Sequence, residues 1–100
     1  MTPTDLNKLR SEIDAIDEKL VELFNRRARC AQEIGRFKQQ KHQAVYEPQR
    51  EEAVIANVTR SNRGPLPDEE LVAIYTALLA AMRRLQSPNL LEPPDLLERK

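Results

Sequence analysis

The chain has 100 residues, of which 40% are hydrophobic and 32% are charged, with a formal net charge of zero and two glycines. These totals fit one small, charge-rich helical domain and exclude a disordered or fibrous chain. Nucleic acid is not expected as a partner, because aromatic residues make up only 4% and there is no net positive charge. No stretch approaches the roughly 18 apolar residues of a membrane span, and the start resembles no signal segment. We therefore expect a cytoplasmic protein that does not bind membranes.

A single helical pattern, running from Leu6 to about Gln40, organises the chain. Its apolar residues recur at spacings of three and four, as on the buried stripe of an amphipathic helix. Pro3 and Asp5 form a helix start, because proline suits the first turn and an acid faces the positive helix end. We predict one unbroken helix over residues 3–40. The stripe consists of Leu6, Leu9, Ile13, Ile16, Leu20, Leu23, Arg27, Cys30 or Ala31, Ile34 and Lys38.

Two shorter helices follow the long one in the pattern. A proline at position 48 opens a predicted helix over residues 48–60, and the Gly-Pro pair at 64–65 marks its stop, because proline cannot continue a helix. Acidic residues then start a third predicted helix, 67–86. We therefore predict an all-α fold with three helices per chain. The helical domain is expected over residues 1–87, and residues 88–100, with three of the seven prolines, are expected to form a tail or linker.

The length of the first predicted helix indicates an oligomer. At 1.5 Å per residue a helix over residues 3–40 is about 57 Å long, whereas a compact domain of this size has a radius of gyration near 13 Å. The two shorter helices cannot cover an apolar stripe of that length. The simplest cover is a second copy of the chain, so we predict an intertwined homodimer of six helices.

Two cations interrupt the apolar stripe of the long helix. Arg27 and Lys38 occupy positions in phase with its leucines and isoleucines, where a buried charge needs a partner. They are eleven residues apart, close to three turns, so they share one face at a separation of about 16 Å. Their long side chains can converge on an anionic ligand between them.

Other polar residues fall on the inward sides of the two shorter helices. Arg50 and Glu51 lie one turn before the apolar positions of the second helix, and Gln86 lies at the edge of the stripe of the third. Together with the two stripe cations they predict a site for a small polyanion. Arg10 is about 26 Å from Arg27 along a straight helix, so it can join this site only from the partner subunit.

Each of these residues also has a structural interpretation. Arg27 fits an interface residue paired with an acid such as Glu51, Lys38 fits a side chain that extends to water, and Gln86 fits a helix cap. The sequence contains no metal-ligand cluster, no glycine-rich phosphate loop and no nucleophile beside a base. We therefore expect no cofactor, no metal and no covalent intermediate.

The chain resembles the all-helical class of chorismate mutase over nearly the whole stretch from Leu6 to Gln86. Five segments carry the resemblance, in the same order as in the family. They are Leu9–Asp14 with Ile16-Asp17, Asn25-Arg26-Arg27, Glu33–Lys38, Val45–Glu51, and Ile74-Tyr75 through Leu85-Gln86. The resemblance implies an intertwined helical dimer that converts chorismate to prephenate on the route to phenylalanine and tyrosine. It covers both single-function enzymes and N-terminal domains of bifunctional ones.

The resemblance also implies a role for each cation and for the amide. Arg27 would bind one substrate carboxylate, and Arg10 of the partner subunit would bind the other. Lys38 would donate to the ether oxygen and to a carboxylate, and Gln86 would donate to the same ether oxygen from its other side.

The remaining implied contacts surround the ring of the substrate. Glu51 would hold the ring hydroxyl, assisted by the backbone near Glu47, and Arg50 would add positive potential. Met82 departs from the pattern, because the family often has a small or hydroxyl residue there.

Two other functions stay open at this point. An isochorismate pyruvate-lyase has a similar fold and similar cations for a related substrate. A non-catalytic dimerisation or regulatory module would use the same polar residues only as interface contacts. Binding of chorismate or of a transition-state mimic separates this module from an enzyme.

Overall fold

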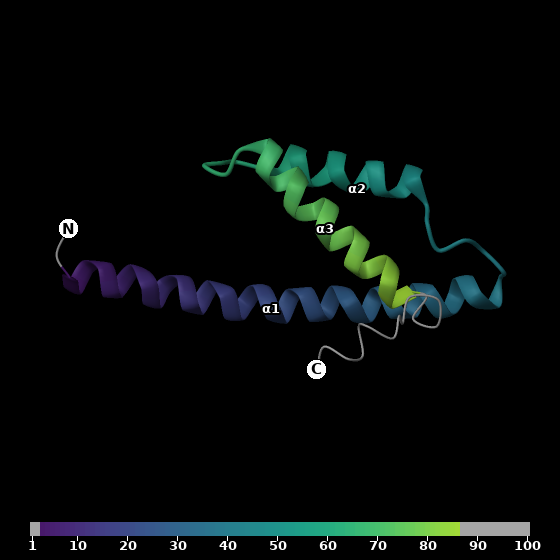
Figure 1. The fold of residues 1–100 in the computed structure, drawn as a ribbon, viewed down its shortest axis with the longest axis horizontal. Helices are drawn as coiled ribbons and strands as arrows, with labels where there is room; N and C mark the ends of the chain where they lie inside the picture. Colours follow the sequence, from purple (N-terminus) through teal and green to yellow (C-terminus); the bar gives the residue numbers. More distant parts are fainter. Residues whose placement is uncertain (1–2, 87–100) are drawn as a thin grey trace, which may run out of the picture. The chain divides into compact units, whose positions relative to one another are not determined.

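The computed structural model describes residues 3–86, which form three α-helices (Figure 1). Helix α1 spans Pro3–Gln40, α2 spans Pro48–Ser61 and α3 spans Asp68–Gln86. The predicted helices and the all-α class are thus confirmed, with bounds that differ by at most one residue. The tail expected at residues 88–100 lies outside the described part of the chain. None of the helices within residues 3–86 combines the length and the apolar composition that a membrane span requires.

Helix α1 ends in a Schellman motif, which turns the chain back toward the helix. The amide of Gln43 donates to the carbonyl of Lys38 at 2.8 Å, and the amide of His42 donates to the carbonyl of Gln39 at 3.2 Å. His42 has a φ of 56°, the left-handed conformation that this motif requires and that glycine usually supplies. The turn therefore directs residues 45–47 past the last turn of α1.

Helix α2 begins at Pro48, where the missing amide of proline costs nothing in the first turn. Its end is tied to the start of α3 by Asn62, whose side-chain nitrogen donates to the carbonyl of Leu66 at 2.8 Å and to a carboxylate oxygen of Asp68 at 2.7 Å. Gly64 has a φ of 70°, as expected for the glycine of this stop signal. The connection returns α3 against α2.

The chain divides into two compact units after Cys30. The first holds the N-terminal part of α1, and the second holds the last turns of α1 together with α2 and α3. In the second unit, α3 runs from the end of α2 to the last turns of α1 (Figure 1). The buried apolar side chains of the described residues are Ala31, Val54, Leu79 and Met82.

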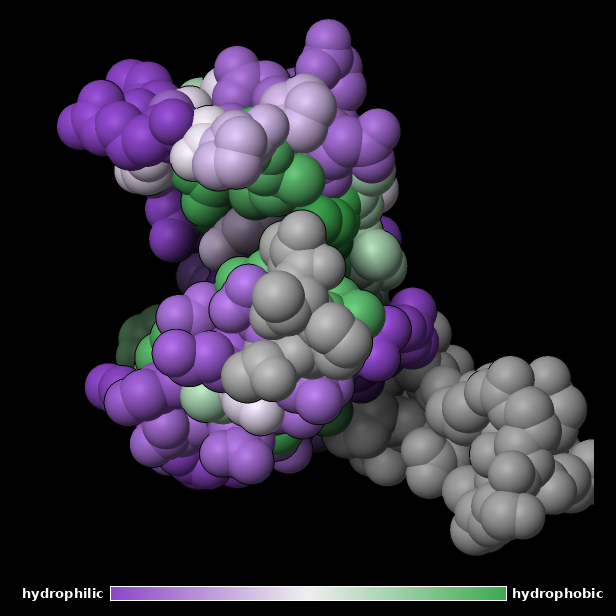
Figure 2. Space-filling view, turned by 90° about the vertical axis from the view of Figure 1, so that its left-hand side faces the viewer, coloured by the Kyte–Doolittle hydropathy of each residue, from purple (hydrophilic) through white to green (hydrophobic). Residues whose placement is uncertain are grey.

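Most large apolar side chains remain exposed in the single chain. On α1, Ile13 and Ile16 are 55% and 56% exposed, although both lie on the predicted core stripe. The space-filling view shows hydrophobic residues at the surface among hydrophilic ones (Figure 2). Such a contiguous apolar stripe is a mark of an interaction surface. The exposed large apolar residues are Leu6, Leu9, Ile13, Ile16, Leu20, Val21, Leu23, Phe24, Ile34, Phe37, Tyr46, Leu66 and Ile74.

Candidate active site

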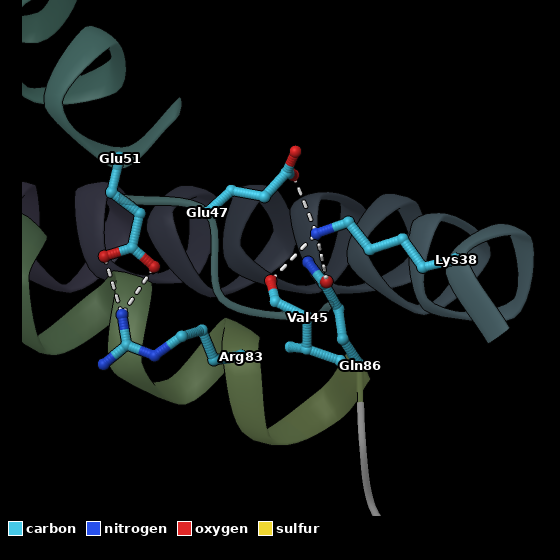
Figure 3. A network of polar contacts seen from close by, with 6 residues as sticks. All are labelled: Lys38, Val45, Glu47, Glu51, Arg83 and Gln86. Atoms are coloured by element: carbon cyan, nitrogen blue, oxygen red, sulfur yellow. Dashed lines mark hydrogen bonds and ion pairs between the residues drawn. The ribbon is translucent and has the colours of Figure 1, made fainter. Parts of the chain in front are cut away.

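The centre of the candidate site is the buried ammonium group of Lys38, in the last turn of α1 (Figure 3). Lys38 is only 6% exposed, so the alternative in which it extends to water is wrong. Its nitrogen donates to the Val45 carbonyl at 2.9 Å and to Oε1 of Gln86 at 3.1 Å, and lies 2.8 Å from a carboxylate oxygen of Glu47. Three acceptors match the three protons of the ammonium group.

The contact with Lys38 settles the orientation of the Gln86 amide. Because a lysine ammonium can only donate, the Gln86 oxygen must face it, and the NH₂ group is the end left to donate elsewhere. Gln86 is therefore more than a helix cap. It presents a neutral donor beside a fixed cation, as the predicted roles of the two residues require.

Gly35 permits this meeting of α1 and α3. A Cβ atom at position 35 would lie 2.8 Å from both the Cα and the carbonyl oxygen of Gln86, closer than such atoms can approach. Backbone atoms cannot rotate away as a flexible side chain can. Glycine is thus needed in the interior of α1, where it otherwise weakens a helix, because the end of α3 rests directly on the helix backbone.

Glu47 enters the site through its side chain. The resemblance implied a contribution from the backbone near this residue, whereas the structure places the Glu47 carboxylate on Lys38. The backbone carbonyl of Glu47 accepts instead from the amide of Glu51 at 3.0 Å, in the first turn of α2. The Glu47 side chain is 53% exposed, whereas the other two acceptors are a backbone carbonyl, at Val45, and the half-buried Gln86, so Glu47 is the acceptor that is freest to move.

A second polar cluster joins α2 to α3 through Glu51 and Arg83 (Figure 3). One guanidinium nitrogen of Arg83, Nη1, donates to both carboxylate oxygens of Glu51, at 2.6 Å and 2.5 Å. The guanidinium carbon also lies 5.0 Å from the centre of the Tyr46 ring, within cation–π range. The ion-pair partner of Glu51 within residues 3–86 is therefore Arg83.

Arg83 was missed by the sequence interpretation. It stands next to a second arginine, Arg84, and such pairs in a last helical turn are usually solvated. Its position did carry a signal, because it lies four residues after the buried Leu79 and hence on the same face of α3. This is the same argument that singled out Arg27 and Lys38.

The remaining predicted residues are Arg10, Arg27, Arg50 and Met82. Arg10 is exposed and Arg27 is half-buried on the first part of α1, and Arg50 is exposed in the first turn of α2. No hydrogen bond or ion pair of these three side chains is found within residues 3–86. Met82 is 6% exposed and belongs to the core. The contact with the substrate ring that the resemblance implies at this position stays a prediction.

An open groove of about 490 Å³ adjoins the second cluster. Glu51 and Ile55 of α2 and Leu79 and Arg83 of α3 line it, and Tyr46 borders it as well. A volume of this size accommodates a small organic molecule. The groove thus combines apolar walls with the Glu51–Arg83 ion pair.

These features define an all-helical protein that holds a buried ammonium and a neutral amide at the meeting point of two helices. The chain belongs to the chorismate mutase type II family, whose sequence model matches residues 9–87. The resemblance inferred from the motifs is thereby confirmed.

Relatives of known structure share this fold. A chorismate mutase from Thermus thermophilus, in its form II, is 33% identical, with 82% of this chain and 93% of that chain covered and a TM-score of 0.81. The chorismate mutase from Helicobacter pylori, solved in complex with prephenate, is 31% identical, with 90% and 98% covered and a TM-score of 0.79.

A longer relative is the bifunctional chorismate mutase/prephenate dehydratase of Pseudomonas aeruginosa. It is 38% identical over 88 residues, which amount to 83% of this chain and 24% of the relative. The chain thus spans about a quarter of the length of the curated relatives that it matches first.

Proposed function

We propose that this chain converts chorismate to prephenate by a Claisen rearrangement. The single observation that carries the proposal is the buried Lys38 ammonium beside a Gln86 amide whose NH₂ group donates to no acceptor within residues 3–86. Membership of the family supports it, as does the prephenate bound in the relative from H. pylori.

The rearrangement requires fixed hydrogen-bond donors, which Lys38 and Gln86 can supply. The rearrangement breaks a carbon-oxygen bond while it makes a carbon-carbon bond, so it needs no general acid, base or nucleophile. Negative charge builds on the ether oxygen as its bond breaks, and fixed donors stabilise that charge without reorganising. Lys38 and Gln86 each supply one donor, worth about 3 kcal/mol in a site shielded from water.

Substrate binding requires Lys38 to exchange one of its three acceptors. Glu47 is the one to leave, because its side chain is half exposed, whereas Val45 offers a backbone carbonyl and Gln86 ends a helix. The freed ammonium proton then points to the ether oxygen or to a substrate carboxylate. Glu47 thus holds Lys38 in place until the substrate arrives.

The remaining cations restrict the substrate to its compact, reactive conformer. Arg27 binds one carboxylate, and Arg10 of the partner subunit binds the other, as guanidinium forks suit carboxylates. Arg50 adds positive potential, and Glu51 accepts the ring hydroxyl. These roles rest on the family resemblance and on the absence of other polar partners for the three arginines within residues 3–86.

The homodimer is part of the proposal. The apolar stripe of α1 remains exposed in the single chain, from Leu6 to Leu23. A second copy of the same helix offers the complementary surface, because a two-fold interface pairs one patch with itself. Each dimer would then hold two sites, each with an arginine from the other subunit. The cytoplasmic location expected from the sequence stays a prediction.

The deciding experiment follows the fate of chorismate with the purified protein. Loss of its ultraviolet absorbance and identification of prephenate, without added cofactor, would support the mutase. Isochorismate is run in parallel, and pyruvate with little prephenate would favour the lyase instead. A folded protein that turns over neither substrate, and whose melting temperature a bicyclic transition-state mimic leaves unchanged, would point to the regulatory module.

A further inference from the structure

We infer that Arg83 is a positioning residue, which aims the Glu51 carboxylate at the substrate hydroxyl and offsets its charge. The inference rests on the proposed function, and it adds a residue to which neither the family resemblance nor the stripe pattern gave a role. It begins from the contact that joins α2 to α3 over a sequence separation of 32 residues.

The geometry fixes the carboxylate and leaves it able to accept. Both Glu51 oxygens receive a hydrogen bond from a single nitrogen of Arg83, at 2.6 Å and 2.5 Å. An ionised carboxylate has about four acceptor positions, so capacity remains on each oxygen for a further donor. Glu51 can thus hold a hydroxyl while Arg83 sets its direction.

Partial burial makes the Arg83–Glu51 interaction stronger than a surface ion pair. The side chains of Arg83 and Glu51 are 34% and 22% exposed. Charge-assisted hydrogen bonds in such surroundings are stronger and better oriented than those between fully solvated groups. The Tyr46 ring, 5.0 Å from the guanidinium carbon, restricts the arginine further.

Residues 45–47 link this pair to the Lys38 cluster. The Val45 carbonyl accepts from Lys38, the Tyr46 ring covers the Arg83 guanidinium, and the Glu47 carbonyl accepts from the amide of Glu51. The segment formed by these three consecutive residues therefore contacts both polar clusters. Through this segment, the Glu51–Arg83 pair is held next to Lys38, at the proposed reaction centre.

Charge balance supplies the second part of the role. A substrate with two carboxylates is repelled by an uncompensated Glu51, because like charges disfavour each other in a partly buried site. The guanidinium of Arg83 offsets that charge at hydrogen-bond distance. Glu51 then acts as an acceptor without opposing the binding of a dianion.

The test compares Arg83→Met with Arg84→Met, a matched change at the exposed neighbouring arginine. Both variants are assayed with chorismate and with an analogue in which hydrogen replaces the ring hydroxyl. We expect Arg83→Met to raise KM for chorismate about 10- to 100-fold, the range for hydrogen bonds to charged groups, with a smaller change in kcat. With the analogue, Arg83→Met should lose less affinity than with chorismate, because the hydroxyl contact is absent while the repulsion from the uncompensated Glu51 carboxylate remains.

Two further variants separate positioning from mere folding. Arg83→Lys keeps the charge and should restore part of the affinity, and Glu51→Gln should remove most of the effect of Arg83→Met in the double variant. Equal losses with both substrates, or no difference between Arg83→Met and Arg84→Met, would overturn the inference. If Arg83→Met does not fold, Arg83→Lys and Glu51→Gln are tested instead. Each should lose more affinity for chorismate than for the analogue that lacks the ring hydroxyl.

The outcomes also distinguish this inference from the proposed function. An unmodified chain that does not convert chorismate would refute the proposed function, and the role of Arg83 would fall with it. If the unmodified chain is active and Arg83→Met behaves like Arg84→Met, only the role of Arg83 would be refuted.

Discussion

The Lys38 ammonium donates to the side-chain oxygen of Gln86 across 3.1 Å and so joins the last turn of α1 to the last turn of α3. One contact thereby places a cation and a neutral NH₂ donor side by side. Both groups sit on helices, and Lys38 is held by two further acceptors. The proposed reaction centre is thus organised before any substrate binds, which is the condition for electrostatic stabilisation of a transition state.

Replacement of Lys38 by methionine tests the cation. We expect kcat/KM for chorismate to fall about 100- to 1,000-fold, the cost of losing one preorganised donor. The helix should persist, because methionine is a good helix former of similar length. Lys41→Met, three residues on and exposed, is the matched control and should retain activity. Turnover by Lys38→Met close to that of the control would contradict the assigned role.

Replacement of Gln86 by leucine tests the neutral donor. We expect a fall in kcat/KM of about 100-fold, with kcat carrying most of it, because the donor acts on charge that develops only in the transition state. The double variant with Lys38→Met should lose less than the product of the two single losses, since the residues touch. Strictly multiplicative losses would show that the residues act independently.

Gly35→Ala tests the approach of α3 to α1. Alanine favours a helix by about 1 kcal/mol over glycine, but overpacking costs about 1–3 kcal/mol, so the net loss of stability should be modest. Turnover should suffer more, because the new Cβ displaces the backbone of Gln86. We expect an activity loss of about tenfold or more, while thermal unfolding shows a folded protein. Gln32→Ala, on the exposed surface of α1, controls for the added alanine.

The exposed apolar stripe of α1 predicts a concentration-dependent dimer. Ile16→Glu places a charge at a position that is 56% exposed in the single chain and covered in the proposed dimer. Sedimentation at micromolar concentration should show dissociation, because an unpaired charge is costly to bury. Ser11→Glu, off the stripe on the same helix, should leave the dimer intact. A folded monomer formed by the unmodified chain would contradict the dimer itself.

Mixed dimers test whether a site takes residues from both chains. Arg10→Ala and Arg27→Ala should each remove most activity, because a substrate carboxylate loses its guanidinium. After subunit exchange, the heterodimer should regain one intact site of its two. The heterodimer fraction is measured by mass spectrometry of the native complex. Full exchange without recovery of activity would show that the two arginines do not serve a shared site.

The helices themselves could be predicted because their signals are local. The spacing of apolar residues, Pro48 at the start of α2 and the Gly64-Pro65 stop act over a few neighbouring positions, and the observed bounds follow them closely. The left-handed turn at His42 was not predicted, because the residue that usually marks this conformation is glycine.

The chain pattern by itself determined the three helices, the cations on the stripe of α1 and the family to which the chain belongs. Only the tertiary structure decided how the polar groups pair: the Glu47 side chain on Lys38, the orientation of the Gln86 amide, and Arg83 on Glu51. The physical reason is that a helical period places a residue on a face of its own helix. Which residue it meets depends on how the helices are packed, here on a glycine that lets the end of α3 rest on α1.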